Sequence, residues 1–194
     1  MKIGVLASQG AFAEHIDILR KLDTEAMPVR LPRELKDLDG LIIPGGESTT
    51  ISRLMSADRL MGEIGALAKK GMPVYGTCAG MIILARGATD FGLDSLGLMD
   101  ITVRRNAFGR QRDSFETDLA IPALGEAPFP AVFIRAPSIA EIHDGTEILA
   151  RLEDGTAVAA RQGNLLVSAF HPELTDDLRF HRYFLDIVRE SRWR

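Results

Sequence analysis

Cysteine is nearly absent from this sequence, since Cys78 is the only one among its 194 residues. A single thiol cannot form an internal disulfide, and the simplest interpretation is a reducing, cytoplasmic compartment. Long apolar runs are also missing. The longest stretch without a charged residue, 71–85, is interrupted by glycine and is shorter than the roughly 20 residues that cross a bilayer. The apolar run near the N-terminus is too short for a signal peptide. We therefore expect a cytoplasmic protein that does not enter a membrane.

Charge of one sign is not in marked excess. The chain has 23 basic and 27 acidic side chains, which gives a net charge of −4. Nucleic acid and anionic membranes attract proteins with a basic surplus, so neither is expected as a partner. No cluster of cysteine and histidine has the spacing of a zinc site, and the glycine motifs of nucleotide-binding loops are missing. The sequence predicts neither a metal nor a cofactor.

Short apolar segments alternate with helical patterns in the first half of the chain. We expect strands at residues 2–7, 26–31, 41–43 and 74–77, and helices at residues 12–22, 49–56, 59–69 and 79–85. Continuous apolar strands separated by helices are typical of a parallel sheet with helices on both faces.

The second half has strand patterns that follow one another closely, at residues 101–104, 115–121, 131–134, 147–152, 157–161 and 165–170. Asp-Gly at 154–155 and Gly-Asn at 163–164 separate the last three at hairpin spacing. An antiparallel portion is therefore expected beside the parallel sheet, followed by a closing helix at residues 175–188. No stretch has the composition of a linker, so residues 1–194 are expected to form a single α/β domain with a mixed sheet.

Cys78 lies where a predicted strand meets a predicted helix, within the segment Gly-Thr-Cys-Ala-Gly at 76–80. Functional groups of open α/β sheets gather at such strand ends. A nucleophile on a sharp turn needs small neighbours, because its backbone is strained and closely packed. The start of a helix also favours the thiolate form. The alternative is that Cys78 is a small buried hydrophobic residue, as free cysteines commonly are.

A candidate base for this thiol is His171, which begins the segment His-Pro-Glu after the strand predicted at 165–170. Pro172 keeps His171 extended. Residues two apart in an extended chain point to the same side. Glu173 is therefore expected to accept the imidazole N–H and to fix its tautomer. By itself the segment is typical of a surface loop before a helix, but beside the cysteine turn it indicates a Cys-His-Glu triad.

The remaining histidines are assigned no catalytic role. His15 falls in the first predicted helix and His181 in the last, and we expect both on solvated faces. His143 falls in a loop.

Acyl chemistry also needs hydrogen-bond donors for a developing oxyanion. The turn Pro-Gly-Gly-Glu-Ser-Thr at 44–49 follows a predicted strand, and its glycines allow backbone N–H groups to face a ligand. The N–H of Ala79 is the second candidate donor. The alternative is a plain turn in which Ser48 or Thr49 caps the next helix.

The segments PGGES, GTCAG and HPE together resemble the class I (triad) glutamine amidotransferase family, which has a flavodoxin-like fold. These three motifs are shared by many amidotransferases. Longer segments, in the same order nearly from end to end, are similar to the glutaminase subunits of pyridoxal 5′-phosphate synthase: MKIGVLASQGAFAEH, RRNAFGRQRDSFETDL, VFIRAP and SAFHPELTDD. RNAFGRQ-x-x-SFE and FIRAP are the more specific ones.

This resemblance implies that Cys78 attacks the side-chain amide of L-glutamine, that His171 moves the protons and that Glu173 orients His171. It also implies a glutamine site and an oxyanion hole, the first formed by Gly46, Glu47, Ser48, Arg105, Ile134 and Arg135, the second by Gly46 and Ala79. A guanidinium suits the carboxylate of an amino acid. Without the resemblance, Arg105 would be interpreted as a solvated strand end and Arg135 as part of a surface ion pair.

The resemblance further implies a partner. Ammonia would pass to a synthase subunit, in a large hetero-oligomer, that makes pyridoxal 5′-phosphate (vitamin B6) from ribose 5-phosphate and glyceraldehyde 3-phosphate. Gln9 and Gly10 fall at the interface in the family pattern. Ser8 departs from that pattern, which has an aliphatic residue before Gln-Gly.

Three other functions compete with this one. Another amidotransferase subunit, for example one serving imidazole glycerol phosphate synthesis, is disfavoured by the RNAFGRQ segment. A binding or regulatory subunit without activity is disfavoured by the intact Cys78, His171 and Glu173. A cysteine peptidase of similar fold is the third alternative, and nothing in the sequence indicates a peptide groove.

Overall fold

The structure is a computed structural model that describes residues 1–89, 94–109 and 114–193. Residues 110–113, which include part of the RNAFGRQ segment, lie outside the described residues.

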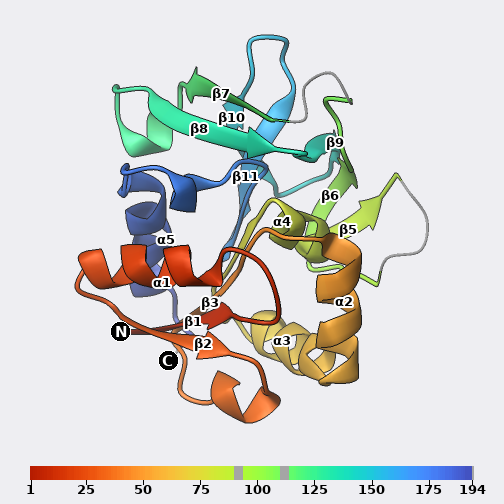
Figure 1. Cartoon of the computed structure of the whole chain (residues 1–194), viewed down its shortest axis with the longest axis vertical. Coiled ribbons are helices and arrows are strands. Elements are labelled where there is room, and N and C mark those ends of the chain that lie inside the picture. Colours follow the sequence, from red (N-terminus) through yellow and green to blue (C-terminus); the bar gives the residue numbers. More distant parts are fainter. Residues whose placement is uncertain (90–93, 110–113, 194) are drawn as a thin grey trace.

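Within the described residues, ten strands form one mixed sheet in the order β2-β1-β3-β4-β12-β11-β9-β6-β5, with β10 paired to β11 (Figure 1). The strands from β2 to β12 run parallel, and β11 is antiparallel to β12, β10 and β9. Their bounds are β1 (Lys2–Leu6), β2 (Glu25–Val29), β3 (Gly40–Ile43), β4 (Val74–Thr77), β5 (Ala85–Ala88), β6 (Met99–Arg104), β9 (Ser138–Ile142), β10 (Glu147–Arg151), β11 (Ala157–Gln162) and β12 (Leu165–Ser168). The predicted parallel sheet, its antiparallel portion and the two hairpins are confirmed, whereas β5 and β9 were not predicted.

Helices cover both faces of the sheet, with α1 and α5 on one side and α2, α3 and α4 on the other (Figure 1). They are α1 (Phe12–Lys21), α2 (Ser48–Ala57), α3 (Leu60–Lys69), α4 (Ala79–Leu84) and α5 (Arg179–Glu190), with short 3-10 turns at η1 (Pro32–Leu35), η3 (Pro122–Leu124) and η4 (Pro172–Leu174).

The prediction that the last helix starts at residue 175 is wrong, because α5 begins only at Arg179. The Asp177 carboxylate accepts the backbone N–H of Arg179 at 3.0 Å and also binds its guanidinium. Asp177 therefore precedes the helix and satisfies its first turn from outside, as a capping side chain does.

A second, two-stranded antiparallel sheet consists of β7 (Ser114–Leu119) and β8 (Phe129–Ile134). Sequence alone did not separate it from the main sheet. The rings of Phe115 and Phe133 stack with centroids 4.6 Å apart, and Phe133 also contacts Phe170. The small sheet is thus tied through its aromatic side chains to the loop after β12.

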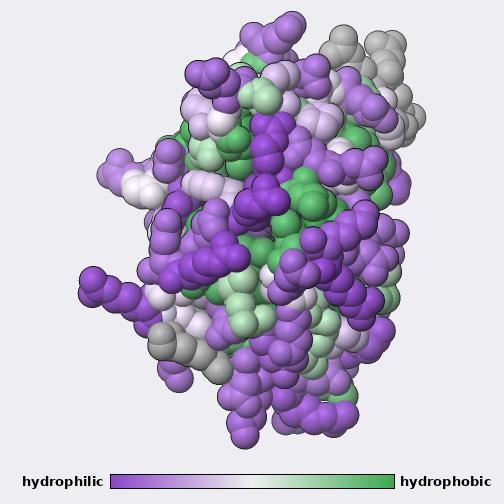
Figure 2. Space-filling model, turned by 90° about the vertical axis from the view of Figure 1, so that its left-hand side faces the viewer, coloured by the Kyte–Doolittle hydropathy of each residue, from purple (hydrophilic) through white to green (hydrophobic). Residues whose placement is uncertain are grey.

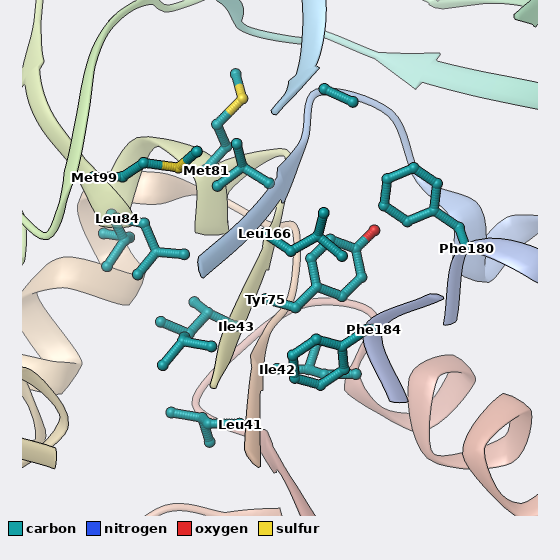
Figure 3. Packing of buried hydrophobic residues seen from close by; sticks show 14 of the residues in the cluster. Leu41, Ile42, Ile43, Tyr75, Met81, Leu84, Met99, Leu166, Phe180 and Phe184 are labelled. Carbon is teal, nitrogen blue, oxygen red and sulfur yellow. The ribbon is translucent and has the colours of Figure 1, made fainter. Parts of the chain in front are cut away.

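Aromatic packing between β4 and α5 forms the centre of the core (Figure 3). The fully buried ring of Tyr75 lies 5.6 Å from both Phe180 and Phe184. Its hydroxyl is 2.8 Å from Ser168 Oγ, which itself donates to the carbonyl of Phe170. Tyr75 is therefore the donor to Ser168, and its polar atom is satisfied inside an apolar layer.

Hydrophilic side chains cover most of the face on the α1 and α5 side, and one apolar area lies near its middle (Figure 2). Among the described residues, none of the helices combines the length and the apolar character that crossing a membrane would require.

Candidate active site

The candidate site forms where three neighbouring parallel strands end. In β3, β4 and β12, Ile43 is in register with Gly76, and Thr77 with Ser168. The loop after β3, Cys78 after β4 and His171 after β12 therefore emerge at the same edge of the sheet. Such an edge is where open α/β sheets place their ligands.

Cys78 occupies a strained turn between β4 and α4, with φ 48° and ψ −102°. A non-glycine residue in such a conformation costs on the order of 1–3 kcal/mol. The predicted need for small neighbours is confirmed. A Cβ on Gly76 would lie 2.5 Å from backbone atoms of Gly80, and a Cβ on Gly80 would lie 2.0 Å from the carbonyl oxygen of Ile43. Only glycines allow α4 to start this close to β3 and β4.

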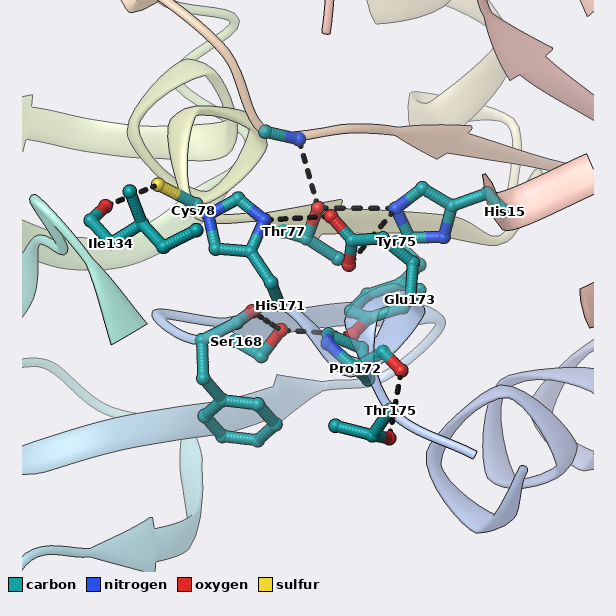
Figure 4. A network of polar contacts seen from close by, with 12 residues as sticks. His15, Tyr75, Thr77, Cys78, Ile134, Ser168, His171, Pro172, Glu173 and Thr175 are labelled. Carbon is teal, nitrogen blue, oxygen red and sulfur yellow. Dashed lines mark hydrogen bonds and ion pairs between the residues drawn. The ribbon is translucent and has the colours of Figure 1, made fainter. Parts of the chain in front are cut away.

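His171 and Glu173 are brought together by η4, as their spacing predicted (Figure 4). His171 Nδ1 lies 2.6 Å from Glu173 Oε1, and both residues are buried. The backbone N–H of His171 donates to the carbonyl of Val132 in β8 at 2.8 Å. Because a carboxylate only accepts, Nδ1 carries the proton of this bond, and Nε2 is left for Cys78.

Burial opposes a charge on His171, but hydrogen bonds to Cys78 and Glu173 outweigh it and raise the pKa of His171 to about 10. Burial likewise works to raise the pKa of Glu173. The nearby His15 and His171 reverse that effect, and the pKa of Glu173 lies below its ordinary value of 4.5. Both shifts favour an imidazolium next to a carboxylate, which is the arrangement that stabilises a thiolate nucleophile.

A cavity of about 320 Å³ opens in front of Cys78 and His171. Its lining includes all the residues predicted for glutamine binding and the oxyanion hole, together with Gln9: Gly46, Glu47, Ser48, Ala79, Arg105, Ile134 and Arg135. Cys78 Sγ lies 3.9 Å from the carbonyl oxygen of Ile134. Glu173 is behind His171, and Gly10 is not part of the lining.

Gly10 packs directly against the loop after β3. Its φ is +92°, and a Cβ there would lie 1.7 Å from the carbonyl oxygen of Gly45. The segment before α1 therefore touches the loop that carries the candidate oxyanion donor.

Opposite charges stand at the mouth of the cavity. The Arg105 guanidinium lies 3.8 Å from the Glu47 carboxylate. Hydrogen bonds from the Thr50 side chain and from backbone N–H groups at the start of α2 lower the pKa of Glu47 to about 2. A fixed cation and a fixed anion can receive the carboxylate and the ammonium group of an amino acid.

Comparison with known proteins identifies the family of this chain. A family model described as the SNO glutamine amidotransferase family matches residues 5–190. The chain belongs to this family. The resemblance inferred from the motifs is thereby confirmed.

Relatives within this family are similar over nearly the whole chain. The pyridoxal 5′-phosphate synthase subunit PdxT of Dehalococcoides mccartyi is 58% identical, covering 97% of this chain and 98% of its own length. The PdxT of Herpetosiphon aurantiacus is 57% identical over 96% of this chain and 100% of its own length. A crystal structure of a glutamine amidotransferase, 46% identical, has a TM-score of 0.92 and covers 96% of this chain and 98% of that one. These similarities confirm the amidotransferase fold.

Two residues of the cavity lining were missed by sequence reasoning, Ile82 and Asn106. Ile82 is in α4 one turn after Cys78, so helical spacing could have indicated it. Asn106 follows Arg105 with φ 45°, and asparagine is among the residues that tolerate this conformation.

The prediction that His15 and His181 lie on solvated faces is wrong, because neither has any exposed surface. His15 Nδ1 lies 2.8 Å from His181 Nε2, and His15 Nε2 lies 3.4 Å from Glu173 Oε2. The two rings join α1 and α5 directly behind the candidate triad (Figure 4 shows His15). In residues 1–89, 94–109 and 114–193, no group of three or more potential ligand side chains is placed to hold a metal ion.

Proposed function

We propose that this chain is the glutaminase subunit of a pyridoxal 5′-phosphate synthase and that it hydrolyses L-glutamine to glutamate and ammonia. Cys78 is the nucleophile, His171 carries the protons and Glu173 orients His171. The observation that supports this most is the 2.6 Å contact of His171 with Glu173 beside a strained Cys78, at a cavity of amino-acid size. The hydrophobic core includes side chains from both sheets, so we propose that residues 1–194 act as one domain.

The chemistry has two halves. The Cys78 thiolate attacks the amide carbon of glutamine, and the carbonyl electrons move to oxygen. Collapse of this intermediate expels ammonia, because His171 donates its proton to the departing nitrogen, and a thioester remains. Water then attacks the thioester and gives a proton to His171. Glutamate leaves, and the proton retained on His171 restores the imidazolium–thiolate pair.

The backbone N–H groups of Gly46 and Ala79 are proposed as donors to the developing oxyanion. Their position supports this role, since both line the cavity next to Cys78. A Cβ on the preceding Gly45 would lie 2.4 Å from His171 Cε1 and 3.3 Å from Cys78 Cβ, so this loop touches the reacting side chains.

The remaining lining residues hold the amino-acid end of glutamine. Arg105 and Arg135 face its carboxylate, and Glu47 its ammonium group. Ser48 and Ile134 complete the walls. The charges at the cavity mouth and the positions of these residues in its lining support the assignment.

The proposed partner is a synthase subunit that uses the ammonia to make pyridoxal 5′-phosphate from ribose 5-phosphate and glyceraldehyde 3-phosphate, in a large hetero-oligomer. Relatives that are 58% identical carry the name pyridoxal 5′-phosphate synthase subunit. Gln9 and Gly10 are proposed as interface residues, because Gln9 is exposed at the cavity and Gly10 packs on its wall. A reduced Cys78 suits the cytoplasm.

The test is glutamate release from L-glutamine with and without the purified synthase subunit, with Cys78→Ala as the blank. We expect activity that depends on the synthase subunit and is lost in the blank. Activity retained by Cys78→Ala would refute the mechanism. Activity only with the synthase of another amidotransferase complex would refute the proposed partner and leave the triad in place.

A further inference from the structure

The polar network of the candidate triad does not end at Glu173. Its Oε1 contacts His171, whereas Oε2 is fully buried and, among the described residues, has no hydrogen-bond partner of ordinary geometry. The contact that the structure gives Oε2 is His15 Nε2 at 3.4 Å, with both side chains fully buried. Burying a carboxylate oxygen without a hydrogen-bond donor costs free energy. The contact with His15 therefore has a large effect on the orientation of the Glu173 carboxylate.

The proton positions in the histidine pair follow from what each ring nitrogen faces. Burial lowers the pKa of His15 and of His181, so both rings are neutral near pH 7. A neutral ring has one N–H and one lone pair. If His15 carried its proton on Nδ1, its Nε2 lone pair would face the carboxylate, which is repulsive. The proton therefore lies on Nε2, and His15 Nδ1 accepts from His181 Nε2–H at 2.8 Å.

The same assignment determines which nitrogen of His181 carries its proton. With its proton on Nε2, its Nδ1 is a bare lone pair, and this atom has no hydrogen-bond partner among the described residues. An unsatisfied lone pair is less costly than an unsatisfied buried N–H. The arrangement that suits Glu173 is thus also the one that suits His181.

Thr77 is the competing acceptor for His15. Its Oγ1 lies 3.3 Å from His15 Nε2, and it already accepts the backbone N–H of Gly45 at 2.9 Å. A charged carboxylate is a stronger acceptor than a hydroxyl. The His15 Nε2–H is therefore shared between Thr77 Oγ1 at 3.3 Å and Glu173 Oε2 at 3.4 Å, and the charged carboxylate is the stronger of its two acceptors.

We infer that His15 is a positioning residue, which donates its Nε2–H to Glu173 Oε2 and thereby holds the carboxylate in its orientation toward His171. The role of Glu173 rests on the proposed function. His15 is not among the residues that line the cavity, and the contact that links it to the candidate triad is the one with Glu173.

Loss of this donor has a defined consequence. A buried carboxylate with one donor fewer takes up a proton at higher pH, and a neutral Glu173 no longer stabilises the His171 imidazolium. Without the imidazolium, the Cys78 thiolate is disfavoured at mildly acidic pH. The other charged or titratable groups that act on this pair are His171 on η4, Glu14 on α1, His181 on α5 and Tyr75 on β4.

The variants His15→Gln and His15→Met form a matched pair. Glutamine places an amide N–H the same number of bonds from Cβ as histidine places Nε2, and methionine places a methyl group there. Both remove Nδ1, the atom that accepts from His181. Tyr75→Phe is the control, since it disturbs the same buried cluster by deleting the hydroxyl that binds Ser168 and leaves His15 in place.

The readout is the rate of Cys78 alkylation by iodoacetamide as a function of pH. It requires neither glutamine nor a synthase, so a failure of the proposed function and a failure of this inference are distinguishable. At pH 6 we expect His15→Met to react roughly tenfold more slowly than the unmodified chain, and His15→Gln and Tyr75→Phe to stay within about threefold. The rates should converge above about pH 9, where a thiol ionises without help.

Equal profiles for the glutamine and methionine variants would overturn the inference. A second measurement needs no variant: the imidazole ¹⁵N and ¹³C chemical shifts of the native protein at pH 7.5 report the tautomer of each histidine. We expect the Nε2–H tautomer for both His15 and His181. A proton on Nδ1 of His15 would also overturn the inference, whatever the behaviour of the variants.

Discussion

The buried pair of imidazoles predicts that the stability of the protein depends on pH in a way that one substitution can isolate. His181 is fully buried, and burial, reinforced by the neighbouring His15, lowers its pKa well below 6.5. The change we consider is His181→Gln. A glutamine amide can still donate to His15 Nδ1 but does not titrate, so the substitution removes the proton equilibrium and keeps the hydrogen bond.

The sign follows from proton linkage. A histidine whose pKa is lowered by folding binds fewer protons in the folded than in the unfolded state, so stability is lost as pH falls below 6.5. At pH 5.5 the unfolded chain is mostly protonated at this site, whereas the folded chain excludes the proton. The cost to the free energy of unfolding is about 1.4 kcal/mol, and at pH 7.5 it is only about 0.1 kcal/mol.

The assay is urea unfolding of the unmodified chain and of His181→Gln at pH 5.5 and pH 7.5, followed by circular dichroism. Comparing the change between the two pH values in the two proteins cancels the titrating groups that His181 does not contact, such as Glu173 and His171. We expect acidification to cost the variant about 1.3 kcal/mol less than it costs the unmodified chain. The same loss in both proteins, within about 0.3 kcal/mol, would show that His181 is not held neutral by the fold.

Four further changes test the packing and the helix capping of the fold. Gly80→Ala would place a Cβ 2.0 Å from the carbonyl oxygen of Ile43, so we expect it to destabilise the protein by about 3 kcal/mol or more in urea unfolding. Gly65→Ala, in the interior of α3 with only an ordinary contact at 3.7 Å, is expected to raise stability by about 0.5–1 kcal/mol. Phe184→Ala empties a fully buried position of the core and should lower the free energy of unfolding by about 3–5 kcal/mol. Glu47→Ala removes the carboxylate that accepts two N–H groups at the start of α2, and a loss of about 1 kcal/mol in the same assay is expected.

The parallel half of the fold was predictable because each strand is a continuous apolar run followed by a helical pattern. The strands that were missed lack this signal. β5 contains Arg86 and Gly87, and only its first residue, Ala85, is buried. β9 alternates little, and its last three residues are exposed. Both belong to the sheet through pairing with β6, a long-range interaction that no local pattern encodes.

The front of the site was predictable for a different reason. Cys78 and His171 each follow an apolar strand. Parallel strands that lie side by side end at the same edge of the sheet, however far apart they are in the sequence. What could not be predicted is that β12, the last strand of the chain, inserts next to β4. The adjacency of Cys78 and His171 depends on that insertion, and the motifs suggested it only through family resemblance.

The back of the site was missed although a signal for it existed. His15 is three residues after Phe12 and four before Leu19, so it lies on the apolar face of α1. His181 is three residues before Phe184 and four before Leu185, so it lies on the apolar face of α5. The prediction of solvated faces for both residues did not take this periodicity into account. Periodicity shows that a histidine is buried, but only the tertiary structure shows which partner it meets.

The candidate site is therefore held in place from two sides, by steric contacts around Cys78 and by polar contacts around Glu173. In front, the strained turn of Cys78 is held by steric contact, because α4 approaches β3 so closely that Gly76 and Gly80 leave no room for relaxation. Behind, Glu173 is held by polar contacts that run through His15 to His181 and so to α5. Steric constraints are insensitive to pH, whereas the polar chain depends on neutral imidazoles. Acidification should therefore disturb the orientation of Glu173 and His171 before it disturbs the turn that presents Cys78.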